Sequence, residues 1–180
     1  MSLIDIDVSS TNSSRQWAKI TSTLRYWFRN RFSTKPLSRA QNQDMELILS
    51  LTTFQGRVKS VYYSIESLFD QDFPAHRIIL WLSKDEFSGI LALPGSLQRL
   101  QKRGLEIRFI EGNIKSYKKL VYALKEFPEA IIVTVDDDSF YPRYLLDGLV
   151  TAHKKFPKAI HCYRGNLISF TDAGELLPYQ

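Results

Sequence analysis

Short apolar runs and amphipathic stretches alternate along residues 45–180. Runs of strand length between polar turns predict buried β-strands, and they fall at residues 46–52, 76–83, 105–111, 130–135 and 159–163. Apolar positions at helical spacing predict helices, and these follow the first four runs at residues 58–68, 96–103, 116–125 and 142–156. This alternation predicts an α/β fold with a mostly parallel, doubly wound sheet and flanking helices.

Ligands of such sheets bind beyond the carboxyl ends of the strands. That rule nominates four loops as the binding edge, at residues 53–57, 84–87, 112–119 and 136–141. Two residues in or next to these loops also carry helix-start signals. Ser116 is suited to cap the helix after the third strand, and Pro142 is suited to the first turn of the last helix.

Residues 1–44 have a different pattern. Polar, linker-like segments at 8–14 and 33–43 flank a stripe of apolar residues near helical spacing, formed by Trp17, Ile20, Leu24, Trp27 and Phe28. Basic residues border the stripe, and no acidic residue lies between Asp7 and Asp44. We favour a helix packed on the body, or a partly disordered tail. The alternatives are a basic amphipathic helix that docks on an anionic membrane or a partner through residues 15–32, and an organellar transit peptide.

The charge of the chain follows the same division. The 24 Lys and Arg and 19 Asp and Glu give a net charge of +5, and seven of the basic but only three of the acidic residues lie in 1–44. The body is nearly neutral, which disfavours a nucleic-acid-binding body. A chain of 180 residues, 44% of them hydrophobic, suffices for one globular domain with a substantial core. We place this domain at residues 45–180, after a basic N-terminal extension at 1–44.

Several classes of protein are excluded by what the sequence lacks. The longest apolar runs, such as residues 78–82, are far shorter than the ~20 residues that a membrane span needs. A single cysteine, Cys162, excludes an intrachain disulfide and a cysteine-based zinc cage. No P-loop, Gly-x-Ser-x-Gly or Gly-x-Gly-x-x-Gly motif occurs. We expect Trp81 and Cys162 to be core residues and His161 to be a hydrogen-bonded polar residue in the last strand.

The fourth nominated loop has the strongest chemical signal. Asp136, Asp137 and Asp138 directly follow the apolar run Ile-Ile-Val-Thr-Val. Adjacent carboxylates at the end of a buried strand repel one another, and a divalent cation would relieve that repulsion. In strand conformation, Asp136 and Asp138 point to one side and Asp137 to the other. Their oxygens suit Mg²⁺ or Mn²⁺ held jointly with substrate phosphates, whereas the simpler interpretation is a solvated acidic turn.

The segment Val-Asp-Asp-Asp-Ser-Phe-Tyr-Pro at 135–142 resembles the Asp-x-Asp motif of GT-A-fold glycosyltransferases. Two further segments strengthen the resemblance, Ser-Leu-Thr-Thr-Phe-Gln-Gly-Arg at 50–57 and Ser-Tyr-Lys-Lys-Leu-Val-Tyr-Ala-Leu-Lys at 116–125. Together they are similar to a bacterial, family-2-like branch of these enzymes that is associated with surface polysaccharide assembly. The resemblance covers residues 45–180 and implies a Rossmann-like nucleotide-diphospho-sugar transferase fold.

The resemblance also implies roles for the aspartates. Asp138 would ligate a metal, Mn²⁺ or Mg²⁺, that bridges the diphosphate of a nucleotide sugar. Asp136 would contact the ribose, or the metal through water. Asp137 occupies the variable middle position, so its role stays open.

Further donor-binding roles follow from the same resemblance. Residues lining the nucleotide pocket would be Thr52, Thr53 and Phe54. Arg57 would reach the base or the diphosphate, unless it is simply solvated. Asp85 or Glu86 would accept a hydrogen bond from the base, although surface positions are equally compatible with the sequence. Lys118 or Lys119 would neutralise the diphosphate, or form a solvated helix face.

The implied activity is metal-dependent transfer of a sugar from a nucleoside-diphosphate sugar to a glycan or lipid-linked acceptor. We expect a cytoplasmic protein, peripheral at the inner membrane if residues 15–32 bind lipid. No catalytic base is assigned, because Asp172 and Glu175 are the only carboxylates after Asp147 and lie in no recognisable motif. Two alternatives stay open. One is a haloacid-dehalogenase-like phosphatase. It is disfavoured because in those enzymes the Asp-x-Asp opens the fold, whereas in this sequence the motif follows three earlier strands and a fourth. The other is a non-catalytic nucleotide-sugar-binding module.

The length of the domain adds one expectation. Residues 45–180 suffice for the nucleotide-binding half of a GT-A fold and for little of the acceptor half. The sequence stops at Leu-Leu-Pro-Tyr-Gln without a terminal helix signal. We therefore expect a truncated gene product, a fragment or a minimal protein with impaired or absent transfer activity.

Overall fold

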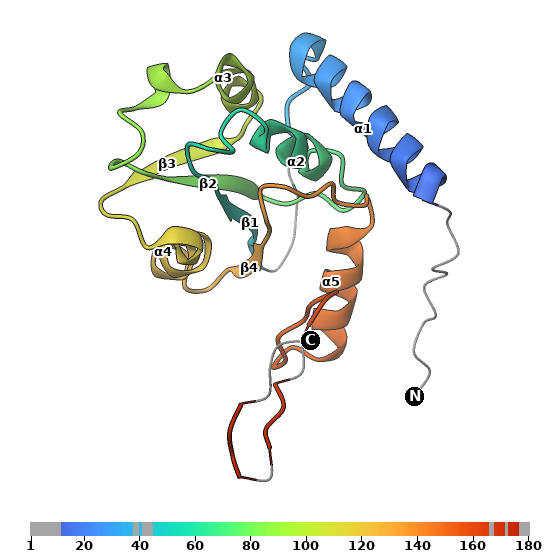
Figure 1. Cartoon of the computed structure of the whole chain (residues 1–180), viewed down its shortest axis with the longest axis vertical. Coiled ribbons are helices and arrows are strands. Elements are labelled where there is room, and N and C mark those ends of the chain that lie inside the picture. The colour runs from blue at the N-terminus through green and yellow to red at the C-terminus, as the bar shows by residue number, and fades with distance from the viewer. Residues whose placement is uncertain (1–11, 38–39, 41–44, 166–167, 172, 177–180) are drawn as a thin grey trace. The chain divides into compact units, whose positions relative to one another are not determined.

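A computed structural model describes residues 12–37, 40, 45–165, 168–171 and 173–176 (Figure 1). The chain divides into two compact units, residues 1–146 and 147–180, which are described separately. The helices and strands of the first unit are α1 Asn12–Phe32, β1 Leu47–Thr52, α2 Val61–Leu68, β2 Arg77–Ser83, α3 Gly95–Lys102, β3 Glu106–Ile110, α4 Lys118–Glu126 and β4 Ile131–Thr134. Short 3₁₀ turns at Ile90–Ala92 and Lys115–Tyr117 precede α3 and α4, and α5, Leu145–Lys155, begins at the end of this unit.

The four strands form one sheet in the order β3-β2-β1-β4, and every neighbouring pair is parallel. Leu49 of β1 lies opposite Ile78 of β2 and Val133 of β4. The central strand β1 is almost wholly buried, as its uninterrupted apolar run predicts. The described chain is therefore an α/β protein with a parallel sheet, which confirms the fold class expected from the alternating pattern.

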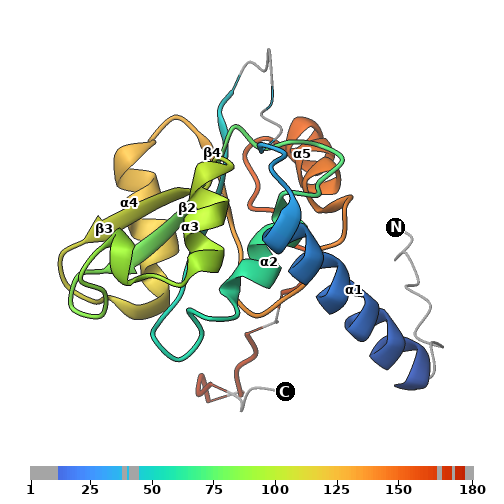
Figure 2. The same ribbon diagram turned by 90° about the horizontal axis from the view of Figure 1, so that it is seen from above.

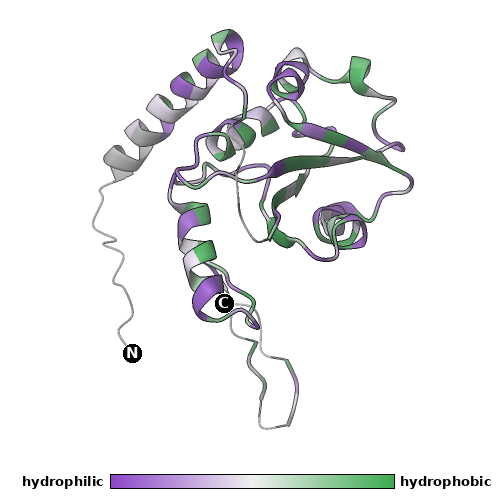
Figure 3. Cartoon of the chain, turned by 180° about the vertical axis from the view of Figure 1, so that it is seen from behind, coloured by the Kyte–Doolittle hydropathy of each residue, from purple (hydrophilic) through white to green (hydrophobic). Residues whose placement is uncertain are grey.

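Helices cover both faces of the sheet. Figures 1 and 2 show α2 and α3 over one face and α4 over the other, and α4 contacts β1, β2 and β4. The strands run largely green through the middle of the unit in Figure 3, where green marks hydrophobic residues. The buried side chains that pack together between the sheet and α4 are Ile48, Ile79, Trp81, Ile110 and, from α4 itself, Ala123. This core fixes the strand ends, and with them the loops of the binding edge.

Helix α1 packs on the same unit, against α2 and α3. This agrees with the favoured interpretation of a helix packed on the body. Residues 12–14 of the predicted linker at 8–14 already belong to α1, and residues 8–11 lie outside the described part of the chain. The second predicted linker, 33–43, is partly built into the unit. Leu37 is buried, and its backbone N–H donates to the carbonyl of Arg103 at 2.6 Å.

Two helix starts differ from prediction. Ser116 does not cap α4, because the chain enters the helix through the 3₁₀ turn Lys115–Tyr117 and Tyr117 takes the cap position without a side-chain hydrogen bond. Pro142 does not open α5, which begins at Leu145. The carbonyl of Arg143 accepts instead from the backbone N–H of Asp72 at 3.0 Å, and this contact holds the segment before α5 as a turn.

The predicted fifth strand at 159–163 is wrong. The segment has no strand conformation in the second unit, and Ile160 is fully exposed. Cys162, expected in the core, is an exposed free thiol. His161 does have a hydrogen-bond partner, the carbonyl of Phe156 at 3.0 Å. The apolar run is interrupted by His161, so it offers too little continuous apolar surface to be stabilised as a buried strand.

Candidate functional site

A cavity of about 470 Å³ opens at the carboxyl ends of the parallel strands. Each of the four loops nominated by topology contributes to its lining, as the general rule for open α/β sheets requires. The lining residues are Thr52, Thr53, Phe54, Arg57, Glu86, Asn113, Lys115, Ser116, Lys118, Lys119, Val135, Asp136, Asp137 and Asp138. The loops therefore bring together residues that lie more than 80 positions apart in the sequence.

The three aspartates after β4 alternate in exposure. Asp136 and Asp138 are exposed, whereas Asp137 between them is buried. This alternation is the one that strand geometry predicts, with the outer two carboxylates on one side and the middle one on the other. The outer pair faces the solvent at the cavity, and the middle carboxylate faces the protein.

Asp137 is held by two donors from the loop after β1. The hydroxyl of Thr53 donates to Oδ2 of Asp137 at 2.6 Å, and the Arg57 guanidinium donates to Oδ1 at 2.9 Å. A buried carboxylate must be paired and hydrogen-bonded to be tolerated. Asp137, whose role the sequence left open, is thus the residue that anchors the aspartate loop to the neighbouring strand end.

Arg57 joins two of the three aspartates. The same terminal nitrogen lies 2.7 Å from Oδ2 of Asp138, and the guanidinium lies over the ring of Phe54 at 5.6 Å from its centre. Hydrogen bonding to Asp137, followed by the charges of Asp137 and Asp138, raises the pKa of Arg57 above its ordinary value. Arg57 therefore supplies a permanent positive charge at the cavity.

Asp136 has a different set of partners. Nζ of Lys119, at the start of α4, lies 2.5 Å from Oδ1 of Asp136. The backbone N–H of Asp136 donates to the hydroxyl of Tyr141 at 2.6 Å, and that hydroxyl in turn donates to the Asp136 carbonyl at 3.2 Å. Burial raises the pKa of Tyr141, so its hydroxyl keeps its proton. Tyr141 fixes the backbone of Asp136, a role that the sequence analysis missed although Tyr141 lies within the nominated loop.

A buried lysine lies deeper in the cavity. Nζ of Lys118, only 2% exposed, donates to Oδ1 of Asn113 at 2.8 Å and lies 3.6 Å from Oε2 of Glu86. That glutamate oxygen is buried and accepts no hydrogen bond within the described part of the chain. Of the two candidates after β2, Glu86 lines the cavity, whereas Asp85 is exposed and does not line it.

The loop after β3 adds two residues that the sequence analysis did not single out. Asn113 accepts both from Lys118 and from the backbone N–H of Lys115, at 3.0 Å. Lys115 has a φ of 55°, in the left-handed region that a residue with a long side chain seldom adopts. Asn113 stabilises this conformation, which presents Lys115 to the cavity. Their position in a nominated loop was the signal that could have found them.

The acidic side chains of the cavity can hold a cation only together with ligands that the protein does not supply. Four basic and four acidic side chains line it. Within the described ranges, no group of three His, Cys, Asp or Glu side chains is arranged to hold a metal ion. Asp136 and Asp138 nevertheless present exposed carboxylates on one side of the loop. Such a pair fits a Mg²⁺ or Mn²⁺ whose remaining ligands are substrate phosphates and water, rather than a cage built from protein alone.

Comparison with known proteins yields little at the level of sequence. No family model matches the chain, and no curated protein matches it. Among solved structures, the chain is similar to a mannosyltransferase of Pyrobaculum calidifontis in complex with GDP-Man and Mn²⁺, at 18% sequence identity and a TM-score of 0.46. The match covers 78% of this chain and 42% of that protein, so this chain spans less than half of its length.

None of the helices in the described part of the chain is long and apolar enough to cross a bilayer.

Proposed function

We propose that this chain binds a nucleoside-diphosphate sugar together with a divalent cation, and that it acts as a glycosyltransferase of the GT-A type. The observation that carries the proposal is the pair of exposed carboxylates, Asp136 and Asp138, in a cavity that also presents Arg57 and Lys119. A diphosphate bound through a cation needs both kinds of group side by side.

The cavity has the size and lining that such a donor requires. Its volume of about 470 Å³ lies within the usual range for small-molecule sites. The ring of Phe54, about half exposed, is available to stack on a nucleobase. Oε2 of Glu86, which lies 3.6 Å from Lys118 and accepts no hydrogen bond within the described residues, is available to accept one from a base or a ribose. The lysines of α4 and the preceding turn place positive charge where the diphosphate would lie.

The aspartates would hold the cation, with Asp138 as direct ligand and Asp136 as a ligand or a ribose contact. When bound, Mn²⁺ or Mg²⁺ would stabilise the negative charge that develops on the departing nucleoside diphosphate. Arg57 and Lys119 form ion pairs with the two carboxylates. With a donor bound, they would also donate hydrogen bonds to its phosphates. Asp137 would keep Arg57 in place throughout, because its hydrogen bond to that guanidinium lies on the protein side of the loop.

A glycan or a lipid-linked glycan is the acceptor class we propose, in surface polysaccharide synthesis on the cytoplasmic side of the membrane. The segments at 50–57, 116–125 and 135–142 support this pathway through their resemblance to bacterial, family-2-like enzymes. The domain boundary proposed at residue 45 coincides with the start of that resemblance.

One observation favours a second candidate, a nucleotide-sugar-binding protein without transfer activity. Every described carboxylate of the cavity faces a cation: Glu86 faces Lys118, Asp136 faces Lys119, and Asp137 and Asp138 face Arg57. An inverting transfer needs a carboxylate free to take the acceptor proton. Phosphatase chemistry is disfavoured, because the aspartates follow the last of the four strands and the middle one is buried.

Calorimetric titration of UDP and GDP, with and without Mn²⁺, tests the proposal. We expect one nucleotide to bind only with the cation, and Asp138→Ala to weaken that binding at least tenfold. Asp85→Ala is the matched control, because Asp85 is exposed at the same sheet edge but does not line the cavity. Nucleotide binding that is equally strong without Mn²⁺ and in Asp138→Ala would overturn the proposal.

Measuring the turnover of a bound donor distinguishes a glycosyltransferase from a nucleotide-sugar-binding protein. Release of nucleoside diphosphate from a bound donor in the presence of acceptor glycans supports transfer, whereas tight binding without release supports the binding protein. Hydrolysis of a simple phosphate monoester that is lost in Asp136→Asn would point to a phosphatase.

A further inference from the structure

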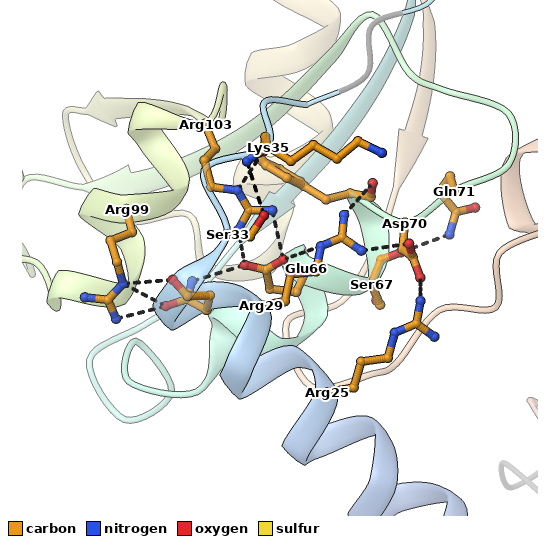
Figure 4. A network of polar contacts seen from close by, with 12 residues as sticks. Arg25, Arg29, Ser33, Lys35, Glu66, Ser67, Asp70, Gln71, Arg99 and Arg103 are labelled. Atoms are coloured by element: carbon orange, nitrogen blue, oxygen red, sulfur yellow. Dashed lines mark hydrogen bonds and ion pairs between the residues drawn. The ribbon is translucent and has the colours of Figure 1, made fainter.

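Helix α1 is attached to its unit through its polar side. Asn30 is buried, and its side chain donates to Oε1 of Glu66 at 3.3 Å and accepts from Arg99 at 2.9 Å. Arg29 contacts Glu66 at 3.2 Å and Asp70 at 2.7 Å. Figure 4 shows Arg29, Glu66, Asp70 and Arg99 gathered between α1, α2 and α3. Tyr26 of the same helix is also buried, and the centre of its ring lies 5.5 Å from that of Phe140.

The opposite side of α1 carries an exposed apolar surface. We define the α1 stripe as the large apolar residues that this helix leaves exposed: Trp17, Ile20, Leu24, Trp27, Phe28 and Phe32. Their spacing of three and four residues places them along one face. The rings of Trp27, Phe28 and Phe32 also contact one another, with centres 4.9 to 6.3 Å apart. A continuous apolar face of this kind on a surface helix marks an interaction site rather than scattered exposure.

The charges of α1 restrict what can cover the stripe. The helix contains five basic and no acidic residues. Arg25 and Arg29 are paired with Asp70, whereas Arg31, which shares the face of Leu24 and Phe28, makes no ion pair within the part of the chain that the structure describes. A second copy of the chain docked through the same face would bring two basic helices together without acidic partners. An anionic surface is complementary to the helix.

We propose that the α1 stripe is a membrane-docking surface, which lies in the interface of a bilayer containing anionic lipids. Tryptophan and phenylalanine favour the boundary between headgroups and acyl chains, and basic side chains beside them are attracted to anionic lipid. The helix binds in the plane of the membrane, since it is not apolar enough to span one. None of the stripe residues lines the cavity, so the proposal does not depend on the function proposed for that site.

Vesicle co-sedimentation tests the proposal with the full chain. The two probes are vesicles of phosphatidylcholine alone and vesicles of equal parts of phosphatidylcholine and phosphatidylglycerol. We expect binding to the anionic vesicles that weakens at high salt, and a blue shift of tryptophan fluorescence on binding. Leu24→Ser should lower the partition coefficient about tenfold, and Arg31→Gln about fivefold on anionic vesicles.

Leu91→Ser is the matched control, because Leu91 is an exposed leucine outside the α1 stripe. It makes the same chemical change and should leave vesicle binding unaltered, and thermal unfolding of all variants checks that they fold. Equal partition of Leu24→Ser and Leu91→Ser, or no binding to anionic vesicles, would overturn the proposal. A concentration-dependent dimer that Leu24→Ser disrupts, without vesicle binding, would assign the stripe to a second copy and overturn it as well.

Discussion

The hydroxyl of Thr53, directly after β1, donates a 2.6 Å hydrogen bond to the buried carboxylate of Asp137, which follows β4. These two strands are neighbours in the sheet, so the bond joins two adjacent strand ends. It turns the middle aspartate toward the protein, and the alternation of the backbone then turns Asp136 and Asp138 toward the cavity. A structural contact thus sets the orientation of the candidate metal ligands.

Removing the hydroxyl should destabilise the protein. We expect Thr53→Val to lower the free energy of unfolding by about 1–3 kcal/mol, because a buried charged acceptor loses one of its two donors. Urea unfolding followed by circular dichroism measures the change. Thr134→Val, at an exposed threonine that ends β4, is the control and should change stability by less than about 0.5 kcal/mol. Equal effects of the two variants would show that the Thr53 bond contributes nothing specific.

Asparagine substitutions should separate the aspartates by role. Asp137→Asn removes a buried charge that Arg57 faces, so it should lower stability by about 2 kcal/mol or more. Asp138→Asn changes an exposed carboxylate, so it should leave stability nearly unaltered while weakening Mn²⁺-dependent nucleotide binding about tenfold or more. Thermal unfolding and calorimetry on both proteins check the pair. A stable Asp137→Asn protein with lost metal dependence would reverse these assignments.

The strands of the sheet were predictable because β1, β2 and β4 are continuous runs of mostly apolar residues and β3 alternates apolar with charged residues. Once the sheet is known to be parallel, the carboxyl ends of its strands predict the edge at which the cavity lies. The partners within that edge were not predictable, because the bonds from Asp137 to Thr53 and Arg57 join residues 84 and 80 positions apart. The strand expected at 159–163 is wrong because His161 interrupts its apolar run, which is too short to be stabilised as a buried strand.

The side of helix α1 that faces the protein was also not predictable from its pattern alone. Its amphipathic pattern predicts a helix, but pattern alone suggests that the apolar side faces inward. The inward side is instead the one that carries Arg29 and Asn30, because Glu66 of α2 is fully buried and needs cationic and amide partners. The sequence contains Glu66 as an acidic residue in an otherwise apolar helix face, and this was the available signal.

The ion pair between Glu66 and Arg103 should be the most sensitive polar contact outside the cavity. The two side chains are joined at 2.5 and 3.2 Å, and both are almost completely buried. Arg103→Met leaves the carboxylate with weaker compensation, so we expect a loss of about 3–5 kcal/mol. Arg108→Met, which removes an arginine that is only partly buried (39% exposed) from the ion pairs of β3, should cost about 1 kcal/mol or less. Chemical denaturation of both variants makes the comparison, and similar losses would contradict a special role for Glu66.

The protein should lose stability at alkaline pH through Tyr62. Burial, followed by a hydrogen bond with Tyr63, raises the pKa of Tyr62 far above its ordinary value of 10.0. The ring is almost fully buried on α2. Above about pH 10 the unfolded chain releases this proton while the folded chain retains it, so the unfolded state binds fewer protons and the free energy of unfolding falls as pH rises.

Tyr62→Phe removes the titrating group. Its free energy of unfolding should therefore fall less steeply above pH 10 than that of the unaltered protein, by at most about 1.4 kcal/mol per pH unit for the one proton involved. Urea unfolding at a series of pH values on either side of 10 measures the two slopes. Tyr117→Phe, at a mostly exposed ring, is the matched control. If both variants kept the slope of the unaltered protein, the alkaline loss would come from other groups, and Tyr62 would have no part in it.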